Sequence, residues 1–287
     1  MPDRRDRELP PSPQALPLPV ADNHTHLDYV RSEEPGVFPA DEQIKSLIGQ
    51  AAAVNVPRLV QIGCDLQAAQ WTVQAVARFP ELIGGVGLHP TEATKHAAAH
   101  DLGDAIAQIE RLAESPGIRV VGETGLDYNW VQDDAGRAAQ IESFRYHIEL
   151  AKRLDKVLQI HDRDAHDDVL RVLAETGAPR RTVFHCFSGD ARMARLCADR
   201  GYYLSFAGTI TFTNAPTLRE ALAAVPLSQV LVETDAPYLT PMPYRGRPNA
   251  SYLVPITVRV MAAVTGGDLE AVCAQLGETT RLVYGEW

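Results

Sequence analysis

The sequence predicts a single-domain (β/α)8 TIM barrel, and three observations lead to this prediction. Short apolar runs rich in β-branched residues alternate with longer stretches of helical periodicity. Eight such pairs follow one another in a chain of 287 residues, a length that one barrel of this type commonly has. No G-x-G-x-x-G turn follows the first apolar run, although that turn is typical of a doubly wound, dinucleotide-binding sheet.

Most of the expected strands are short runs in which large apolar residues predominate. In chain order the strands cover residues 20–23, 58–62, 82–86, 119–122, 157–160, 182–184, 203–206 and 230–233. A helix is expected after each strand, because apolar residues there recur at helical spacing, as Ile141, Phe144 and Ile148 do. These helices cover residues 41–54, 66–78, 97–113, 137–154, 165–175, 191–200, 216–224 and 252–264. One or two closing helices are expected over 268–277 and 279–284.

The first 19 residues are rich in proline and charge, a composition that favours a flexible tail, so the barrel is expected to cover residues 20–287. No run approaches the roughly 18 apolar residues that a membrane span requires. The start of the chain also lacks the apolar core of a signal peptide. We therefore expect a cytoplasmic protein without a membrane partner.

Charge and cysteine content argue against three features. The net charge of −10 argues against a broad basic surface for duplex DNA, although a local phosphate site is compatible with it. The four cysteines have no C-x-x-C spacing, so neither a disulfide framework nor a thiolate zinc site is expected.

Ionisable residues collect at the carboxyl ends of the expected strands, where a barrel of this type builds its site. They are His24, His26, His89, Glu123, His161, His185, Glu233 and Asp235. His24 and His26 are two residues apart, so on a strand both side chains face the same way and can bind one ion. Burying so many unpaired polar groups would cost about 1–3 kcal/mol each, so we interpret them as metal ligands.

This ligand set suits two ions that share a bridging carboxylate, but it does not determine which metal is bound. Such a pair activates water at neutral pH, which is hydrolytic chemistry. The four remaining histidines fall in expected helices or just before them, and we expect them to lie on solvated faces: His96, His100, His147 and His166.

Six motifs in this order resemble the TatD family of metal-dependent deoxyribonucleases, within the amidohydrolase-like barrels. They are D-N-H-T-H-L-D at 22–28, G-L-H-P at 87–90, G-E-T-G-L-D-Y at 122–128, Q-I-H-D-R-D-A at 159–165, H-C-F-S-G at 185–189 and E-T-D-A-P-Y-L-T-P at 233–241. The resemblance runs from about Val20 to Tyr284.

The resemblance implies a two-metal site with divalent Mg, Mn or Zn. One ion would be held by His24, His26, Glu123 and Asp235, and the other by Glu123, His161 and His185. Glu123 would then be the bridge. Asp235 would also be the general base for the attacking water. The alternative is that Asp235 serves only as a metal ligand.

Four further residues are candidates for substrate contacts. The resemblance implies that His89 contacts a substrate phosphate. Arg163 and Arg245 carry guanidinium groups whose geometry suits hydrogen bonds to phosphate oxygens. The alternative is that these arginines lie at the surface without contacting the substrate. Tyr128, like Tyr238, could stack on a base, although packing is the commoner role of such tyrosines.

The loop after the last strand departs from the family pattern. Members often have R-G-x-x-N-E-P, whereas this chain has R-G-R-P-N-A-S, with Ala250 and Ser251 in place of the acid and the proline. The departure affects the expected conformation of the loop and the substrate rather than the metals.

The leading hypothesis is a deoxyribonuclease of DNA repair that trims single-stranded or damaged ends from the 3′ side, with no obligate protein partner. Two alternatives remain: a metal-dependent hydrolase of ester, amide or aminoacyl-tRNA bonds on the same barrel, and a barrel without catalytic activity.

Overall fold

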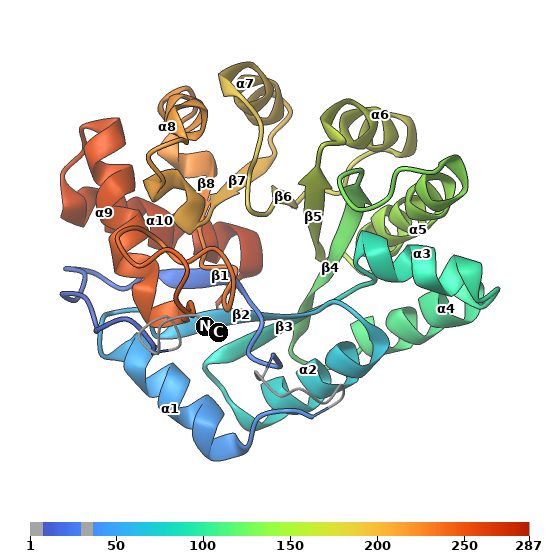
Figure 1. The fold of residues 1–287 in the computed structure, drawn as a ribbon, viewed down its shortest axis with the longest axis horizontal. Helices are drawn as coiled ribbons and strands as arrows, with labels where there is room; N and C mark the ends of the chain where they lie inside the picture. Colours follow the sequence, from blue (N-terminus) through green and yellow to red (C-terminus); the bar gives the residue numbers. More distant parts are fainter. Residues whose placement is uncertain (1–7, 30–36, 287) are drawn as a thin grey trace, which may run out of the picture. The chain divides into compact units, whose positions relative to one another are not determined.

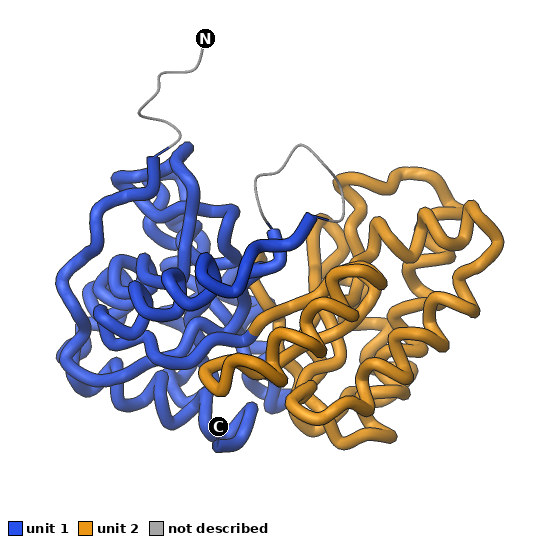
Figure 2. The backbone as a smooth tube through the Cα atoms, turned by 90° about the horizontal axis from the view of Figure 1, so that it is seen from below, with its two compact units in different colours: residues 1–60, 189–287 blue, residues 61–188 orange. Residues whose placement is uncertain are grey.

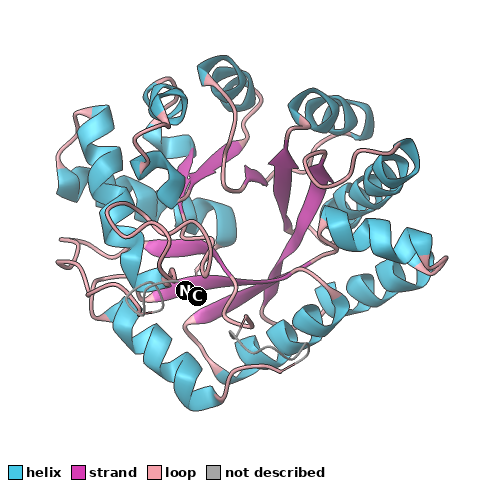
Figure 3. Cartoon of the chain, in the orientation of Figure 1, coloured by secondary structure: helices cyan, strands magenta, loops and turns pink. Residues whose placement is uncertain are grey.

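The computed structural model describes residues 8–29 and 37–286 and has the predicted alternation of strands and helices (Figures 1 and 3). The strands form one sheet in which neighbours follow chain order from β1 to β8. They are β1 (Ala21–Thr25), β2 (Arg58–Gly63), β3 (Leu82–Val86), β4 (Ile118–Asp127), β5 (Val157–Arg163), β6 (Thr182–Phe184), β7 (Tyr203–Phe206) and β8 (Val230–Val232). Pairs within this order, such as β4 with β5 and β7 with β8, are parallel. The predicted (β/α)8 class is confirmed.

The chain divides into two compact units, which Figure 2 colours separately. The first unit combines Met1–Val60 with Gly189–Trp287, and the second is Gln61–Ser188. The units are therefore not consecutive domains, because the first contains residues from both ends of the chain.

In the second unit, helices pack on strands β3, β4 and β5, of which β4 carries Glu123 and β5 carries His161. These helices are α2 (Leu66–Arg78), α3 (Pro90–Ala98), α4 (Leu102–Ala113), α5 (Asp134–Arg153) and α6 (His166–Thr176). Helix α5 packs on β4, and its buried residues include Phe144 and Ile148 from the predicted apolar stripe. The single helix expected over 97–113 is wrong. His100 has a left-handed φ of 60°, and this turn separates α3 from α4.

Strand β4 is longer than the expected 119–122 because two glycines let it pass close to β5. Gly122 and Gly125 have φ values of 141° and 139°. A Cβ on Gly122 would lie 2.4 Å from the carbonyl oxygen of Gln159, and one on Gly125 would lie 2.1 Å from that of His161. The β4–β5 register shifts between Val121 and Thr124. Glu123 lies within this irregularity, so the glycines determine where its backbone runs.

The first unit contains β1, β7 and β8 with five α-helices from the described residues. They are α1 (Asp41–Ala52), α7 (Ala191–Asp199), α8 (Pro216–Ala223), α9 (Val254–Thr265) and α10 (Leu269–Tyr284). Helix α10 contacts β1 and β8. One or two closing helices were expected over 268–277 and 279–284, and α10 is one continuous helix across both ranges. The Asp268 side chain caps its first turn by accepting from the amides of Glu270 and Ala271.

The expectation of a flexible tail over residues 1–19 is wrong for residues 8–19; residues 1–7 lie outside the described residues. Leu16 exposes only 2% of its surface. The hydroxyl of Tyr252 donates to the carbonyl oxygen of Pro10 at 2.5 Å, and Arg259 donates to that of Ala15 at 3.0 Å. Prolines prevent regular structure here, but the segment still offers carbonyl acceptors and the buried apolar residues Pro10 and Leu16, so it packs on the barrel helices.

Candidate metal centre

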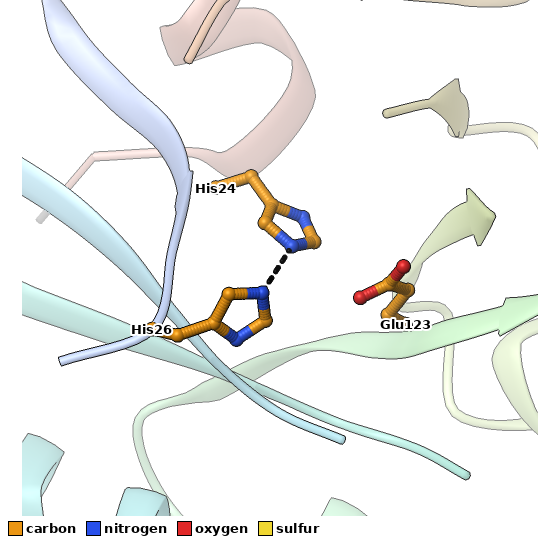
Figure 4. A group of neighbouring side chains, drawn as sticks. All are labelled: His24, His26 and Glu123. Carbon is orange, nitrogen blue, oxygen red and sulfur yellow. Dashed lines mark hydrogen bonds between the residues drawn. The ribbon is translucent and has the colours of Figure 1, made fainter. Parts of the chain in front are cut away.

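The two histidines of the first motif lie together at the end of β1, as predicted from their spacing. His24 is fully buried, and its Nε2 lies 3.1 Å from Nε2 of His26. Figure 4 shows the two rings turned toward each other, and it also labels Glu123 of β4. Oδ1 of Asp235, which follows β8, lies 3.3 Å from Nε2 of His26 and 3.7 Å from Nε2 of His24. We call His24, His26 and Asp235 the first cluster.

Backbone bonds between β1 and the segment after β8 hold the first cluster together. The amide of Asp235 donates to the carbonyl oxygen of His24 at 3.0 Å, and the amide of His26 donates to that of Ala236 at 2.8 Å. Asp22, which shares the strand face of the two histidines by alternation, is used differently. It accepts bonds from the amide and hydroxyl of Thr234, and burial raises its pKa to about 7. Asp22 therefore anchors the residue before Asp235.

The second cluster consists of Glu123 on β4, His161 on β5 and His185 after β6. Oε1 of Glu123 lies 2.5 Å from Nδ1 of His161 and 2.8 Å from Nε2 of His185. The two histidine nitrogens are 3.4 Å apart. Three donor atoms, from β4, from β5 and from the residue after β6, thus lie close together, and Glu123 and His185 are buried.

Asp127 supports the second cluster, and the sequence interpretation did not assign it a role. Its Oδ2 lies 3.0 Å from Nε2 of His161, and its Oδ1 accepts from the Trp130 amide at 2.9 Å. Burial alone would raise the pKa of Asp127, but the bonds from His161 and Trp130 outweigh it and lower that pKa. Burial likewise opposes charge on His161, but Asp127 and Glu123 raise its pKa. The sequence position of Asp127 could have indicated this role, because Asp127 is four residues beyond Glu123 on the same strand.

Two more residues contact Glu123. The thiol of Cys64, just after β2, donates to Oε2 at 3.2 Å, a contact that no motif indicated. Nε2 of His89 lies 3.7 Å from Oε1, while its Nδ1 accepts from the Thr91 amide at the start of α3. Burial, assisted by the nearby His161, lowers the pKa of His89 to about 3. His89 is therefore a neutral ring beside the second cluster, and its contact with substrate stays a prediction.

The candidate substrate residues lie in different surroundings. Arg163 is exposed at the end of β5, two residues beyond His161. Arg245 is exposed in the loop after β8, with its guanidinium 4.4 Å from the ring centre of Phe212. The hydroxyl of Tyr128 donates to Asp168 at 2.7 Å, and burial followed by this bond raises its pKa to about 12.

One of the four histidines expected on solvated helix faces is buried. His147 on α5 is fully buried. Its Nδ1 donates to the carbonyl oxygen of Ser143 at 2.7 Å, and its Nε2 accepts from the Leu88 amide at 3.2 Å. Burial lowers its pKa to about 4. His147 thus fastens α5 to the loop before His89 rather than facing water.

The chemistry of both clusters fits divalent metal ions. Each combines imidazole nitrogens with one carboxylate, which is a donor set for zinc, manganese or iron. Such closely opposed donor atoms are favourable when a cation lies between them. In the second cluster, the bond between His161 and Asp127 is the kind of support that metal-binding histidines commonly have. Among the described residues, no helix has the length and apolar character to cross a membrane.

Comparisons with known proteins agree with this chemistry. The chain is 43% identical over 269 residues to the "uncharacterized metal-dependent hydrolase TatD" of Mycobacterium tuberculosis, covering 93% of this chain and 98% of that protein. It is 34% identical to the "uncharacterized metal-dependent hydrolase YcfH" of Escherichia coli K12, covering 88% and 90% of the two chains. The crystal structure of YjjV, a TatD homologue from E. coli, superposes with a TM-score of 0.82 at 25% identity, covering 93% and 98%.

The family described as "TatD related DNase" matches residues 21–285, which is nearly the whole barrel. This range contains all six motifs and both clusters. The chain therefore belongs to the TatD family of metal-dependent hydrolases.

Proposed function

We propose that this protein is a divalent-metal-dependent deoxyribonuclease that removes nucleotides from the 3′ ends of single-stranded or damaged DNA. The observation that carries the proposal is the second cluster, in which one carboxylate oxygen lies within 2.8 Å of two imidazole nitrogens. In a family described as related to DNases, such a donor set supports phosphodiester hydrolysis. The first cluster would hold one ion and the second another. The sharing of Glu123 by both ions stays a prediction.

The ions, when bound, would lower the pKa of water and neutralise charge that develops on the phosphate. The protein's own residues supply the remaining functions. The side chain of Asp235 is 15% exposed, so water can reach its carboxylate and transfer a proton to it. The neutral ring of His89 can donate a hydrogen bond to a phosphate oxygen through Nε2, because its Nδ1 already accepts from Thr91.

Two arginines would position the substrate. Arg163 follows the ligand His161 on the same strand, and Arg245 lies in the segment that also carries Asp235. One guanidinium group can donate hydrogen bonds to two phosphate oxygens at once. These local positive charges would attract a strand end although the whole chain has a net charge of −10.

The test uses single-stranded DNA labelled at either end, incubated with purified protein and Mg²⁺ or Mn²⁺. We expect release of nucleotides from the 3′ end, loss of that activity in Asp235→Asn, and no loss in His96→Ala. His96 is a matched control because it pairs with Asp101 outside both clusters. DNA that stays intact with either metal would refute the proposal.

The same assay separates the alternative hydrolase of ester, amide or aminoacyl-tRNA bonds. A nuclease that loses both Arg163 and Arg245 should have a much higher KM for DNA. If activity on DNA persists unchanged in the double variant, while small esters are cleaved faster than DNA, the alternative is favoured.

A further inference from the structure

Two exposed tyrosines lie beside the first cluster. Tyr29 exposes 51% of its surface and Tyr238 exposes 48%. Their ring centres are 5.7 Å apart, and the ring of Tyr238 is also 6.2 Å from that of His26. Aromatic rings usually bury most of their area. An exposed aromatic pair next to proposed metal ligands therefore indicates a surface that a ligand covers.

The backbone of each tyrosine is tied to a residue of the first cluster. The amide of Tyr29 donates to the carbonyl oxygen of His26 at 3.2 Å, and the amide of Tyr238 donates to that of Asp235 at 2.9 Å. Each tyrosine thus ends a turn that begins at a cluster residue. The distance between each ring and the first cluster is therefore set by a short turn rather than by a long loop.

Tyr238 is held more firmly than this turn alone requires. The buried side chain of Asn249 donates to the carbonyl oxygen of Tyr238 at 2.5 Å and to that of Thr234 at 2.9 Å. Asn249 comes from the loop that departs from the family pattern at the next two positions. Its contacts hold the segment from Thr234 to Tyr238 in one conformation while the ring stays exposed.

We propose that Tyr29 and Tyr238 form a binding surface for the base of a nucleotide beside the scissile phosphate. This inference rests on the proposed nuclease function and names the substrate contact of the same site. The two rings are tilted by 54°, so a planar base lies flat on only one of them. Tyr238 is the stacking ring because its backbone is held at both ends, and Tyr29 contacts the edge of the base.

Stacking suits an enzyme that accepts many sequences, because every base has an aromatic face. Tyr128, the other tyrosine considered for this role, is less suitable. Its hydroxyl is bonded to Asp168, and the guanidinium of Arg137 lies 4.3 Å from its ring centre. The structure thus favours Tyr238 over Tyr128 and adds Tyr29, which no motif indicated.

The experiment measures binding of fluorescent single-stranded oligonucleotides with phosphorothioate linkages to the metal-loaded protein. One oligonucleotide is complete. Each of two others lacks one of the two bases that flank the 3′-terminal linkage, so the two abasic strands differ in which base is missing. A stacked base contributes about 1–3 kcal/mol, so Tyr238→Leu should weaken binding of the complete strand about 5- to 150-fold. It should not weaken binding of one of the two abasic strands.

Tyr238→Phe should bind like the wild type, because it keeps the ring, and Tyr29→Leu should have a smaller effect. Tyr203→Leu is the matched control, since Tyr203 lies at the opposite, amino end of a strand. The inference is refuted if Tyr238→Leu weakens all three strands equally or weakens none. A wild type that neither binds nor cleaves DNA would overturn the proposed function, and this inference with it.

Discussion

Replacing Asp127 with asparagine should weaken metal binding at the second cluster without unfolding the protein. In the wild type, Asp127 offers one oxygen to Nε2–H of His161 and the other to the Trp130 amide. Proton placement on Nε2 leaves the Nδ1 lone pair of His161 directed at the point where Glu123 and His185 meet. The carboxylate thus selects the ring tautomer that can bind an ion.

Asparagine cannot maintain both bonds, because it has only one acceptor oxygen. If that oxygen stays with Trp130, the amide NH₂ faces Nε2 of His161. The ring proton then moves to Nδ1 and blocks the position of the ion. Loss of such supporting partners typically costs about 10- to 100-fold in metal affinity, which corresponds to about 1.4–2.7 kcal/mol.

The assay is titration of metal-depleted protein with Mn²⁺ or Zn²⁺ against a competing chelator, together with activity as a function of metal concentration. Asp101→Asn is the matched control, because Asp101 also pairs with a histidine, at 2.8 Å, but at the surface and outside both clusters. A supporting role predicts that excess metal restores part of the activity of Asp127→Asn. Unchanged metal affinity in Asp127→Asn would refute the reasoning.

Three other perturbations have expected outcomes. Lowering the pH from 7 to 5 should destabilise the wild type by about 2 kcal/mol more than His147→Gln. The pKa of His147 in the folded protein, about 4, lies below the ordinary value of 6.5. The stability that the neutral ring contributes is therefore complete above pH 6.5 and is lost as the pH falls toward 4. Equal losses of stability in the wild type and in His147→Gln, measured by urea denaturation, would contradict this. Leu16→Ala should lower the free energy of unfolding by about 2–5 kcal/mol. Leu9→Ala, at a position that is 43% exposed, should change it by less than about 1 kcal/mol; similar values for both variants would show that the segment is not packed. Removing metal with a chelator should lower Tm, and Mn²⁺ at 100 times its Kd should restore about 2.7 kcal/mol; a Tm that does not respond would argue against metal sites in the folded protein.

Most strand positions could be predicted from the sequence because buried parallel strands are short apolar runs. The prediction was least accurate at β4, where it ended at Gly122 and the strand continues to Asp127. The letters G-E-T-G-L-D contain two glycines and two acids, a composition that is unusual for a strand. The extension depends on the close approach of β5, which only glycine permits at these two positions.

The strand prediction at β4 was too short, whereas the helix expected over 97–113 was too long. Its alanine-rich start has good helical propensity, but the chain turns at His100 and starts again after Asp101. Local propensity could not indicate this turn. The two resulting helices pack differently, because α3 packs mainly on α5, whereas α4 packs on α2 as well as on α5.

The sequence by itself determined the order of strands and helices and the placement of histidines and acids at strand ends, since both follow from periodicity over a few residues. Tertiary structure decided which atoms meet. Asp127 supports the second cluster because it contacts His161, which is 34 residues away in the chain. The buried ring of His147 accepts a hydrogen bond from the Leu88 amide. The proline-rich segment packs on the barrel because its carbonyl oxygens accept hydrogen bonds from Tyr252 and Arg259. These contacts join residues far apart in the chain, so their energies depend on how whole elements pack, and no local pattern in the sequence records that packing.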